Sequence, residues 1–167
     1  MNAISAEAKY AFIKINSKYE TTGKVVLKFM KEGQYKLKLR VPSWSSESVL
    51  SYDDIKLMVE PGYVCVDEYF EVGDEITLQF DTSLTAHVID DSVAFTKGVT
   101  LLAYDEEKQD VAYNDVVIDL KKLKAKNAKK NIPEKMRLTI NGYTFSDYAS
   151  CGKTWRNKTM GCWVRAK

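Results

Sequence analysis

The sequence has few of the residues that build catalytic or metal centres. It contains one histidine, His87, and three cysteines in 167 residues, and no two cysteines have the CxxC spacing. A histidine without a second histidine or a cysteine near it in sequence is a poor candidate for a metal ligand. The sequence also has no serine nucleophile elbow and no phosphate-binding glycine loop. We therefore expect no metal, no cofactor and no catalytic residue in this chain.

The cysteines do not form an evident disulfide framework, because three cysteines cannot all pair within one chain. Cys65 lies in the apolar run Tyr63–Val66, which predicts a small buried thiol. Cys151 and Cys162 would form a bridge only in an oxidising compartment. The sequence does not identify such a compartment, so their pairing is left open.

Long apolar runs and large net charge are also missing. The first ten residues lack a charged region followed by a long apolar segment, so we expect neither a signal peptide nor a membrane anchor there. A net charge of +2 gives no strong attraction to nucleic acid or to anionic lipid. We expect no nucleic-acid and no membrane partner, while localisation and oligomeric state are left open. The 45% hydrophobic content and ten tyrosines favour a folded globular domain over disorder.

The clearest secondary structure in the sequence is Gln34–Val41. Apolar residues alternate there with Lys36, Lys38 and Arg40, which places the cations on one face of a half-buried strand. Pro42 cannot donate to a sheet ladder, so the strand is expected to end before it.

Similar short strands, separated by turns about every ten residues, recur along the chain without a sustained helical period. This pattern predicts an all-β fold, an antiparallel β-sandwich of the jelly-roll-like kind. The first three strands are expected to form a meander. The predicted strands are Tyr10–Ile15, Lys24–Met30, Gln34–Val41, Ile55–Val59, Tyr63–Val66, Ile76–Phe80, Leu84–Ile89, Ser92–Thr96, Val99–Tyr104, Met136–Ile140, Tyr143–Tyr148 and Met160–Val164.

One stretch breaks the strand pattern, because six lysines crowd into Lys121–Lys130. The stretch is predicted to be a short Lys-rich helix or a loop insertion. Clustered lysines also attract phosphate, but no aromatic residue interleaves with them, which favours a solvated connection. We therefore divide the chain into a β-sandwich core (1–118), a Lys-rich connection (119–134) and C-terminal strands that complete or extend the sandwich (135–167).

Pairs of adjacent acidic residues are a poor match for sugar hydrolysis. Glycoside hydrolysis needs two carboxylates held across a sugar, and neighbours in an extended chain point to opposite sides. We expect Asp53-Asp54, Asp90-Asp91 and Glu106-Glu107 to lie in turns.

Aromatic rings offer a different route to sugar recognition, since an exposed ring can stack on the face of a sugar. Trp44, Tyr63 and Trp155 are the candidate carbohydrate-binding residues, and Trp163 is a further tryptophan of this kind. In a sandwich of this size, packing in the core or in an interface is the favoured explanation for such tryptophan rings.

Four segments, in this order, resemble a known family. They are LRVPSW at Leu39–Trp44, GYVCVDEYFEVGDEITLQF at Gly62–Phe80, VAFTKGVTLLAY at Val93–Tyr104 and DYASCGKTW at Asp147–Trp155. Together they resemble the β-sandwich region that follows the catalytic barrel in glycoside hydrolase family 127, the β-L-arabinofuranosidase-like proteins. The sequence departs from the family pattern at Phe70, where tryptophan is usual, at Lys97, where arginine is usual, and at Val99-Thr100, where Pro-Leu is usual.

The resemblance implies a role without catalysis. Members of the family carry a glutamate and a cysteine–zinc site on an (α/α)6 barrel, and no part of that barrel is in this sequence. The chain would then be a non-catalytic accessory β-sandwich that packs on the barrel, and it would expose an apolar patch when isolated. The alternative is a carbohydrate-binding module that recognises plant-type oligosaccharides. An enzyme in its own right would have to use His87 or a cysteine.

Overall fold

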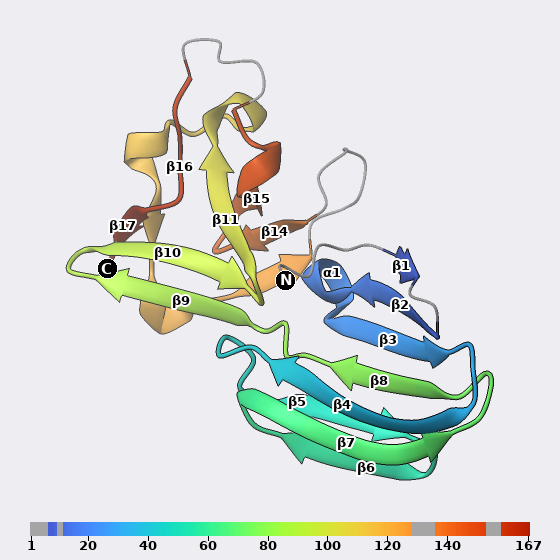
Figure 1. Cartoon of the computed structure of the whole chain (residues 1–167). Helices are drawn as coiled ribbons and strands as arrows, with labels where there is room; N and C mark the ends of the chain where they lie inside the picture. The colour runs from blue at the N-terminus through green and yellow to red at the C-terminus, as the bar shows by residue number, and fades with distance from the viewer. Residues whose placement is uncertain (1–6, 10–11, 128–135, 153–157) are drawn as a thin grey trace. The chain divides into compact units, whose positions relative to one another are not determined.

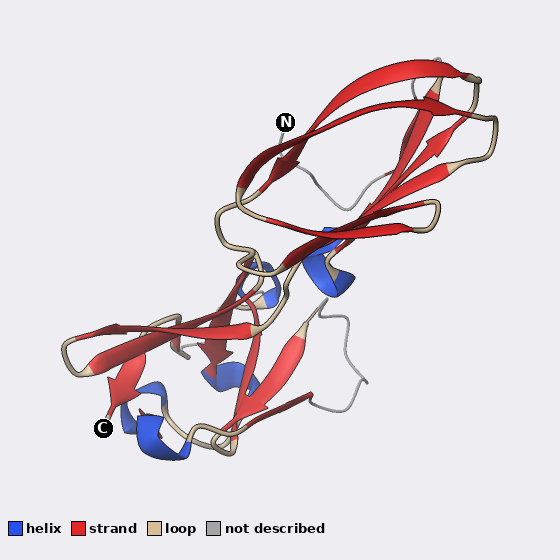
Figure 2. Ribbon diagram, turned by 90° about the horizontal axis from the view of Figure 1, so that it is seen from below, coloured by secondary structure: helices blue, strands red, loops and turns tan. Residues whose placement is uncertain are grey.

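The structure is a computed structural model that describes residues 7–9, 12–127, 136–152 and 158–167. The chain divides into two compact units, the N-terminal unit Met1–Ser83 and the C-terminal unit Leu84–Lys167 (Figure 1). Strands dominate both units, and helix is confined to short turns (Figure 2). The predicted all-β sandwich class is confirmed. No boundary was predicted near residue 83, and the division predicted at residues 118 and 134 differs from these two units.

The N-terminal unit is a sandwich of one six-stranded sheet and one two-stranded ribbon. The six strands, in spatial order, are β1 (Glu7–Lys9), β2 (Ile13–Lys18), β3 (Lys24–Phe29), β8 (Glu75–Gln79), β5 (Ser48–Tyr52) and β6 (Ile55–Val59), with the short helix α1 (Tyr19–Thr22) between β2 and β3. The ribbon pairs β4 (Gly33–Val41) with β7 (Gly62–Phe70) along nine residues of each strand. As predicted, β4 ends immediately before Pro42.

The predicted meander of the first three strands is wrong. Strand β3 pairs with β2 and β8, whereas β4 leaves that sheet and pairs only with β7. The turn at Lys31-Glu32-Gly33 therefore joins the two layers of the sandwich rather than two neighbours in one sheet. A local turn signal specifies that the chain reverses, but the partner of each strand depends on which apolar faces meet across the core. Strand β5 is not among the predicted strands.

Aromatic side chains from both layers build the core of the N-terminal unit. Phe29 of the sheet stacks on Phe70 of the ribbon with ring centroids 4.0 Å apart and planes 6° from parallel. Tyr35 lies 4.9 Å from Phe29, and both phenylalanines are at most 1% exposed. Because β4 alternates, its apolar residues face these rings while Lys36 and Lys38 face away.

Gly23 closes α1 at a position that only glycine fits. Its φ of 73° lies in the left-handed region, and a Cβ there would stand 2.3 Å from the carbonyl oxygen of Phe80. The backbone can therefore turn from α1 into β3 directly against the end of β8.

The C-terminal unit contains a nine-stranded mixed sheet. Its strands are β9 (Leu84–Ile89), β10 (Ser92–Lys97), β11 (Thr100–Asp105), β12 (Val117–Ile118), β13 (Ala125–Asn127), β14 (Arg137–Ile140), β15 (Tyr143–Asp147), β16 (Met160–Gly161) and β17 (Val164–Ala166). Four 3-10 helices join them: η1 (Glu106–Lys108), η2 (Tyr113–Asp115), η3 (Leu120–Lys122) and η4 (Tyr148–Ser150).

Four of the predicted strands form two hairpins in this unit. Strands β10 and β11 pair around Lys97-Gly98, and β14 and β15 pair around Asn141-Gly142. Asn141 adopts a left-handed φ of 48°, as a two-residue hairpin turn requires. The predicted last strand, Met160–Val164, is instead split between β16, which pairs with β11, and β17, which pairs with β10 and β12.

The core of the C-terminal unit is separate from that of the N-terminal unit. Phe95, Leu102, Tyr104 and Phe145 are fully buried in it, and the Tyr104 and Phe145 rings meet edge to face at 5.9 Å. The Tyr104 hydroxyl donates to the carbonyl of Val111 at 2.6 Å, so its polar end is satisfied. Within the described residues, no helix is long and apolar enough to cross a membrane.

Candidate functional site

The three predicted carbohydrate-binding residues lie in very different surroundings. Trp44 is half-buried and packs edge-on against Phe80, with ring centroids 5.6 Å apart, and against Tyr19 at 6.3 Å. Tyr63 is 61% exposed. Trp155 lies outside the described residues. The ring of Trp44 therefore belongs to the edge of the N-terminal core. Among the described candidates, Tyr63 and the further tryptophan Trp163, which is 42% exposed, are open to solvent.

Tyr63 lies on the outer face of the β4–β7 ribbon. The Nζ atom of Lys38 stands 4.7 Å from the centroid of its ring, which is a cation–π contact. Tyr69, six residues further along β7, points to the same face and is 58% exposed. Tyr69 was not among the predicted candidates, although the period-two pattern of β7 places Tyr63, Cys65 and Tyr69 on one face.

Cys65 is exposed, so the predicted burial of its thiol is wrong. In β7 it occupies an outward position opposite Lys38, whereas its neighbours Val64 and Val66 point to the core. An apolar run in a strand does not bury every side chain, because successive residues face opposite sides of the sheet.

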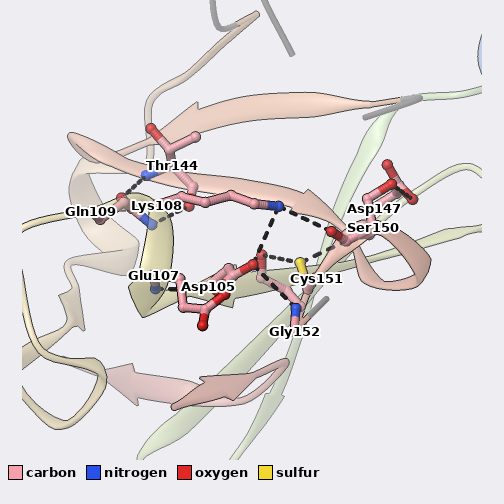
Figure 3. Close-up of polar contacts among 10 residues, drawn as sticks. Asp105, Glu107, Lys108, Gln109, Thr144, Asp147, Ser150, Cys151 and Gly152 are labelled. Carbon is pink, nitrogen blue, oxygen red and sulfur yellow. Dashed lines mark hydrogen bonds and ion pairs between the residues drawn. The ribbon is translucent and has the colours of Figure 1, made fainter. Parts of the chain in front are cut away.

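The C-terminal unit contains a buried polar cluster that links η1 to η4 (Figure 3). The carboxylate of Asp105, which is 3% exposed, lies 3.2 Å from Nζ of Lys108 and accepts from the backbone N–H of Glu107 and of Gly152, each at 3.2 Å. Lys108 also donates to the carbonyl of Ser150 at 3.0 Å. The cluster therefore ties the end of β11 to the segment after η4.

A second buried carboxylate completes this cluster. Asp147 accepts from the Ser150 hydroxyl at 2.8 Å and from the backbone N–H of Met136 at 3.2 Å. Close by, the side-chain amide of Gln109 both donates to and accepts from the backbone of Thr144, at 2.7 and 2.8 Å. Because these polar groups satisfy one another, the cluster serves to hold loops and leaves no carboxylate aimed at a ligand.

Cys151 lies in the same cluster and is a poor nucleophile. Its Sγ atom is 3.5 Å from the carbonyl of Asp147 and 3.8 Å from that of Ala103. Burial raises the pKa of the Cys151 thiol to about 11, and the nearby Lys108 only partly opposes this. Burial also raises the pKa of the Cys162 thiol. The reactive thiolate form is therefore scarce near neutral pH.

Alkylation measures this difference among the cysteines directly. With iodoacetamide at pH 8 we expect the exposed Cys65 to react first and Cys151 to stay largely unmodified. The rate at Cys151 should rise by about tenfold for each pH unit toward pH 11, because the thiolate fraction rises in that proportion below the pKa. Peptide mapping by mass spectrometry gives the three rates. Equal rates at Cys65 and Cys151 at pH 8 would contradict this description of the site.

No cluster of metal ligands is formed in the described part of the chain. His87 is exposed on β9, and its Nε2 lies 2.8 Å from the Thr96 hydroxyl. No group of three or more His, Cys, Asp or Glu side chains in the described ranges is placed to hold a metal ion. Asp53-Asp54 and Asp90-Asp91 lie in turns, as expected, and Glu106-Glu107 opens η1.

The two units thus define an all-β protein whose described residues assemble no catalytic constellation. Comparison with known proteins gives further information on the fold. No family model matches the sequence, and no curated protein does. Solved structures do match, and three of them are glycoside hydrolases.

The first of these three is a family 127 β-L-arabinofuranosidase from Geobacillus stearothermophilus T6, with a TM-score of 0.70 and 17% identity over 97% of this chain and 32% of that chain. A second glycoside hydrolase gives a TM-score of 0.75 with 14% identity, covering 92% of this chain and 32% of the other. A family 127 β-arabinofuranosidase gives 0.74 with 16% identity, covering 97% and 33%.

These matches confirm, at the level of the fold, the resemblance found in the sequence. The chain shares its fold with a region of family 127 glycoside hydrolases and spans about a third of the length of the structures it matches.

Proposed function

We propose that this chain acts as a non-catalytic accessory β-sandwich of a family 127-like glycoside hydrolase, packing on and supporting an (α/α)6 catalytic barrel. The observation that carries the proposal is the extent of the match. Almost the whole chain corresponds to about a third of each of the three enzymes, so most of each enzyme has no counterpart here. A support role also agrees with the buried carboxylates of Asp105 and Asp147, which are hydrogen-bonded within the C-terminal unit.

An apolar edge in the N-terminal unit supports a packing role. Strand β6 ends the six-stranded sheet, and Ile55, Leu57 and Met58 on it are 40%, 46% and 69% exposed. Edge strands of isolated domains are normally blunted by charge or covered, because they otherwise pair with other chains. β6 carries a single charged residue, Lys56. A catalytic barrel that covered this strand would bury the apolar side chains and protect the sheet edge.

Hydrolysis assays test whether the chain is an enzyme by itself. We expect purified chain to release no p-nitrophenol from p-nitrophenyl β-L-arabinofuranoside above the rate in buffer. Turnover that survives repeated purification and is lost in a His87→Ala or Cys65→Ala variant would overturn the non-catalytic assignment.

A carbohydrate-binding module is the alternative, and the exposed ring of Tyr63 is the observation that favours it. If the accessory role is correct, NMR titration with arabino- and galacto-oligosaccharides should leave the backbone amide shifts unchanged at millimolar sugar. Saturable shifts around Tyr63 that vanish in Tyr63→Ala would instead assign a sugar site to the ribbon. Tyr148→Ala is the matched control, because Tyr148 is similarly exposed, at 53%, but lies in η4.

A further inference from the structure

A cavity in the C-terminal unit gathers lysines that the proposed function does not use. Its volume is about 520 Å³, which is within the range of small-molecule sites. It is open to solvent and is walled by residues from η3 through β13, from the β14–β15 hairpin and from the end of β17. The lining residues are Val117, Asp119, Lys122, Lys124, Lys126, Thr139, Asn141, Gly142, Tyr143 and Lys167.

The charge in this cavity is strongly one-sided. Four lysines line it, and Asp119 is the only acidic residue among the lining residues. The Asp119 carboxylate accepts the backbone N–H of Lys121 at 3.1 Å and lies 3.9 Å from Nζ of Lys122. Within the described residues, Lys124, Lys126 and Lys167 form no ion pair. Three of the four lining lysines therefore have no ion-pair partner among the described residues, and the mutual repulsion of their charges favours a bound anion.

The turn residue Asn141 holds the main chain of the segment that carries Lys122 and Lys124. Its Oδ1 atom accepts the backbone N–H of Lys124 at 2.8 Å, and its Nδ2 donates to the carbonyl of Asp119 at 2.9 Å. Its own backbone N–H donates to the carbonyl of Lys124, also at 2.9 Å. One asparagine thus clamps both ends of the segment 119–124 to the β14–β15 hairpin.

Backbone pairing also holds the main chain at the other two lining lysines, Lys126 and Lys167. Lys126 pairs with Thr139 across β13 and β14. The backbone N–H of Lys167 donates to Ile118 at 2.9 Å, and its carbonyl accepts from Leu120 at 3.1 Å. The main chain of the described part of the Lys-rich stretch is therefore hydrogen-bonded along one wall of the cavity, while residues 121–126 are exposed to solvent.

We propose that this cavity binds a small phosphate-bearing ligand, such as a sugar phosphate. A phosphate group carries more charge than a carboxylate and accepts from several directions, which suits separate ammonium groups. The hydroxyls of Thr139 and Tyr143 line the same cavity and supply neutral hydrogen-bonding groups for the remainder of the ligand.

The test is an NMR titration of the ¹⁵N-labelled chain with glucose 6-phosphate, inorganic phosphate and galacturonate at one fixed ionic strength. We expect saturable shifts with both phosphates, confined to residues 117–126, 139–143 and 167, and at least about tenfold weaker binding of galacturonate. Glucose 6-phosphate that binds more tightly than inorganic phosphate would show that the sugar contributes, and equal affinities would show that the phosphate group alone is recognised. Both outcomes support the site.

Two variants with the same change in charge distinguish binding in the cavity from nonspecific electrostatic attraction of the phosphate to the lysines. Lys124→Gln removes a lining lysine and should weaken glucose 6-phosphate binding by about tenfold. Lys121→Gln removes an exposed lysine of the same segment that does not line the cavity, and should change the affinity by less than about twofold. Equal losses in the two variants, absence of saturable shifts, or galacturonate binding as tight as phosphate would overturn the proposal. Unchanged circular dichroism in both variants shows that the comparison is between folded proteins.

Discussion

Replacing Phe29 by alanine is expected to lower the free energy of unfolding by about 3–5 kcal/mol, the usual cost of truncating a fully buried phenylalanine. Phe29 is 0% exposed, and its ring stacks on Phe70 at 4.0 Å and contacts Tyr35 at 4.9 Å. These three rings join the sheet and the ribbon of the N-terminal unit, so the cavity would open between its two layers.

Urea unfolding followed by tryptophan fluorescence measures this effect. Trp44 packs against Phe80 in the same core and reports on the N-terminal unit. Tyr69→Ala is the control, because it removes an aromatic ring of the same ribbon that is 58% exposed. We expect the control to shift the urea midpoint only slightly. A Phe29→Ala variant as stable as the control would show that the two layers do not pack as described.

Replacing Asp105 by asparagine is expected to destabilise the chain by about 3 kcal/mol, since it removes one partner of a buried ion pair. The change leaves the ammonium of Lys108, now 3.2 Å from a neutral amide, with the Ser150 carbonyl as its acceptor. It also weakens the acceptor of the backbone N–H groups of Glu107 and Gly152. The cluster in Figure 3 would lose the charge at its centre.

Hydrogen exchange shows which part of the chain loses stability in Asp105→Asn. The amides of Glu107 and Gly152 should exchange faster in Asp105→Asn, together with a lower urea midpoint. The matched control is Asp67→Asn, in which the carboxylate is exposed and pairs with Lys36 at 3.5 Å. Because a solvated ion pair contributes little, the control midpoint should stay near that of the unchanged chain. Unaltered exchange at both amides would show that Asp105 does not hold the cluster.

Alternation of apolar and polar residues was enough to predict most strands and the β10–β11 and β14–β15 hairpins. These are local features, set by period-two patterns and by turns such as Asn141-Gly142. The pairing of β4 with β7 joins residues more than twenty positions apart, and no short pattern encodes it. For the same reason the boundary near Ser83 was not predicted, since it depends on contacts that each half makes with itself.

Candidate sites were harder to predict than strands. Tyr63 is exposed whereas Trp44 packs against the core. The exposure of an aromatic ring depends on where it packs in the fold, and the residue type does not reveal this. The hydrogen bonds that tie the Lys-rich stretch to the β14–β15 hairpin were not predicted, because Asn141 lies seventeen residues from Lys124 in sequence. The buried pair of Asp105 and Lys108 is visible in sequence only as an acid three residues before a lysine, a pattern that is common on exposed turns.

The accessory role is tested most directly by asking what this chain is attached to or bound to in the cells that make it. An antibody raised against the purified chain, followed by native mass spectrometry of the captured material, gives the answer. The proposal predicts a single longer polypeptide, or a stable complex, that contains a helical glycoside hydrolase barrel and hydrolyses an arabinofuranoside. Recovery of the chain alone, as a 19.0 kDa species without such a barrel, would contradict it.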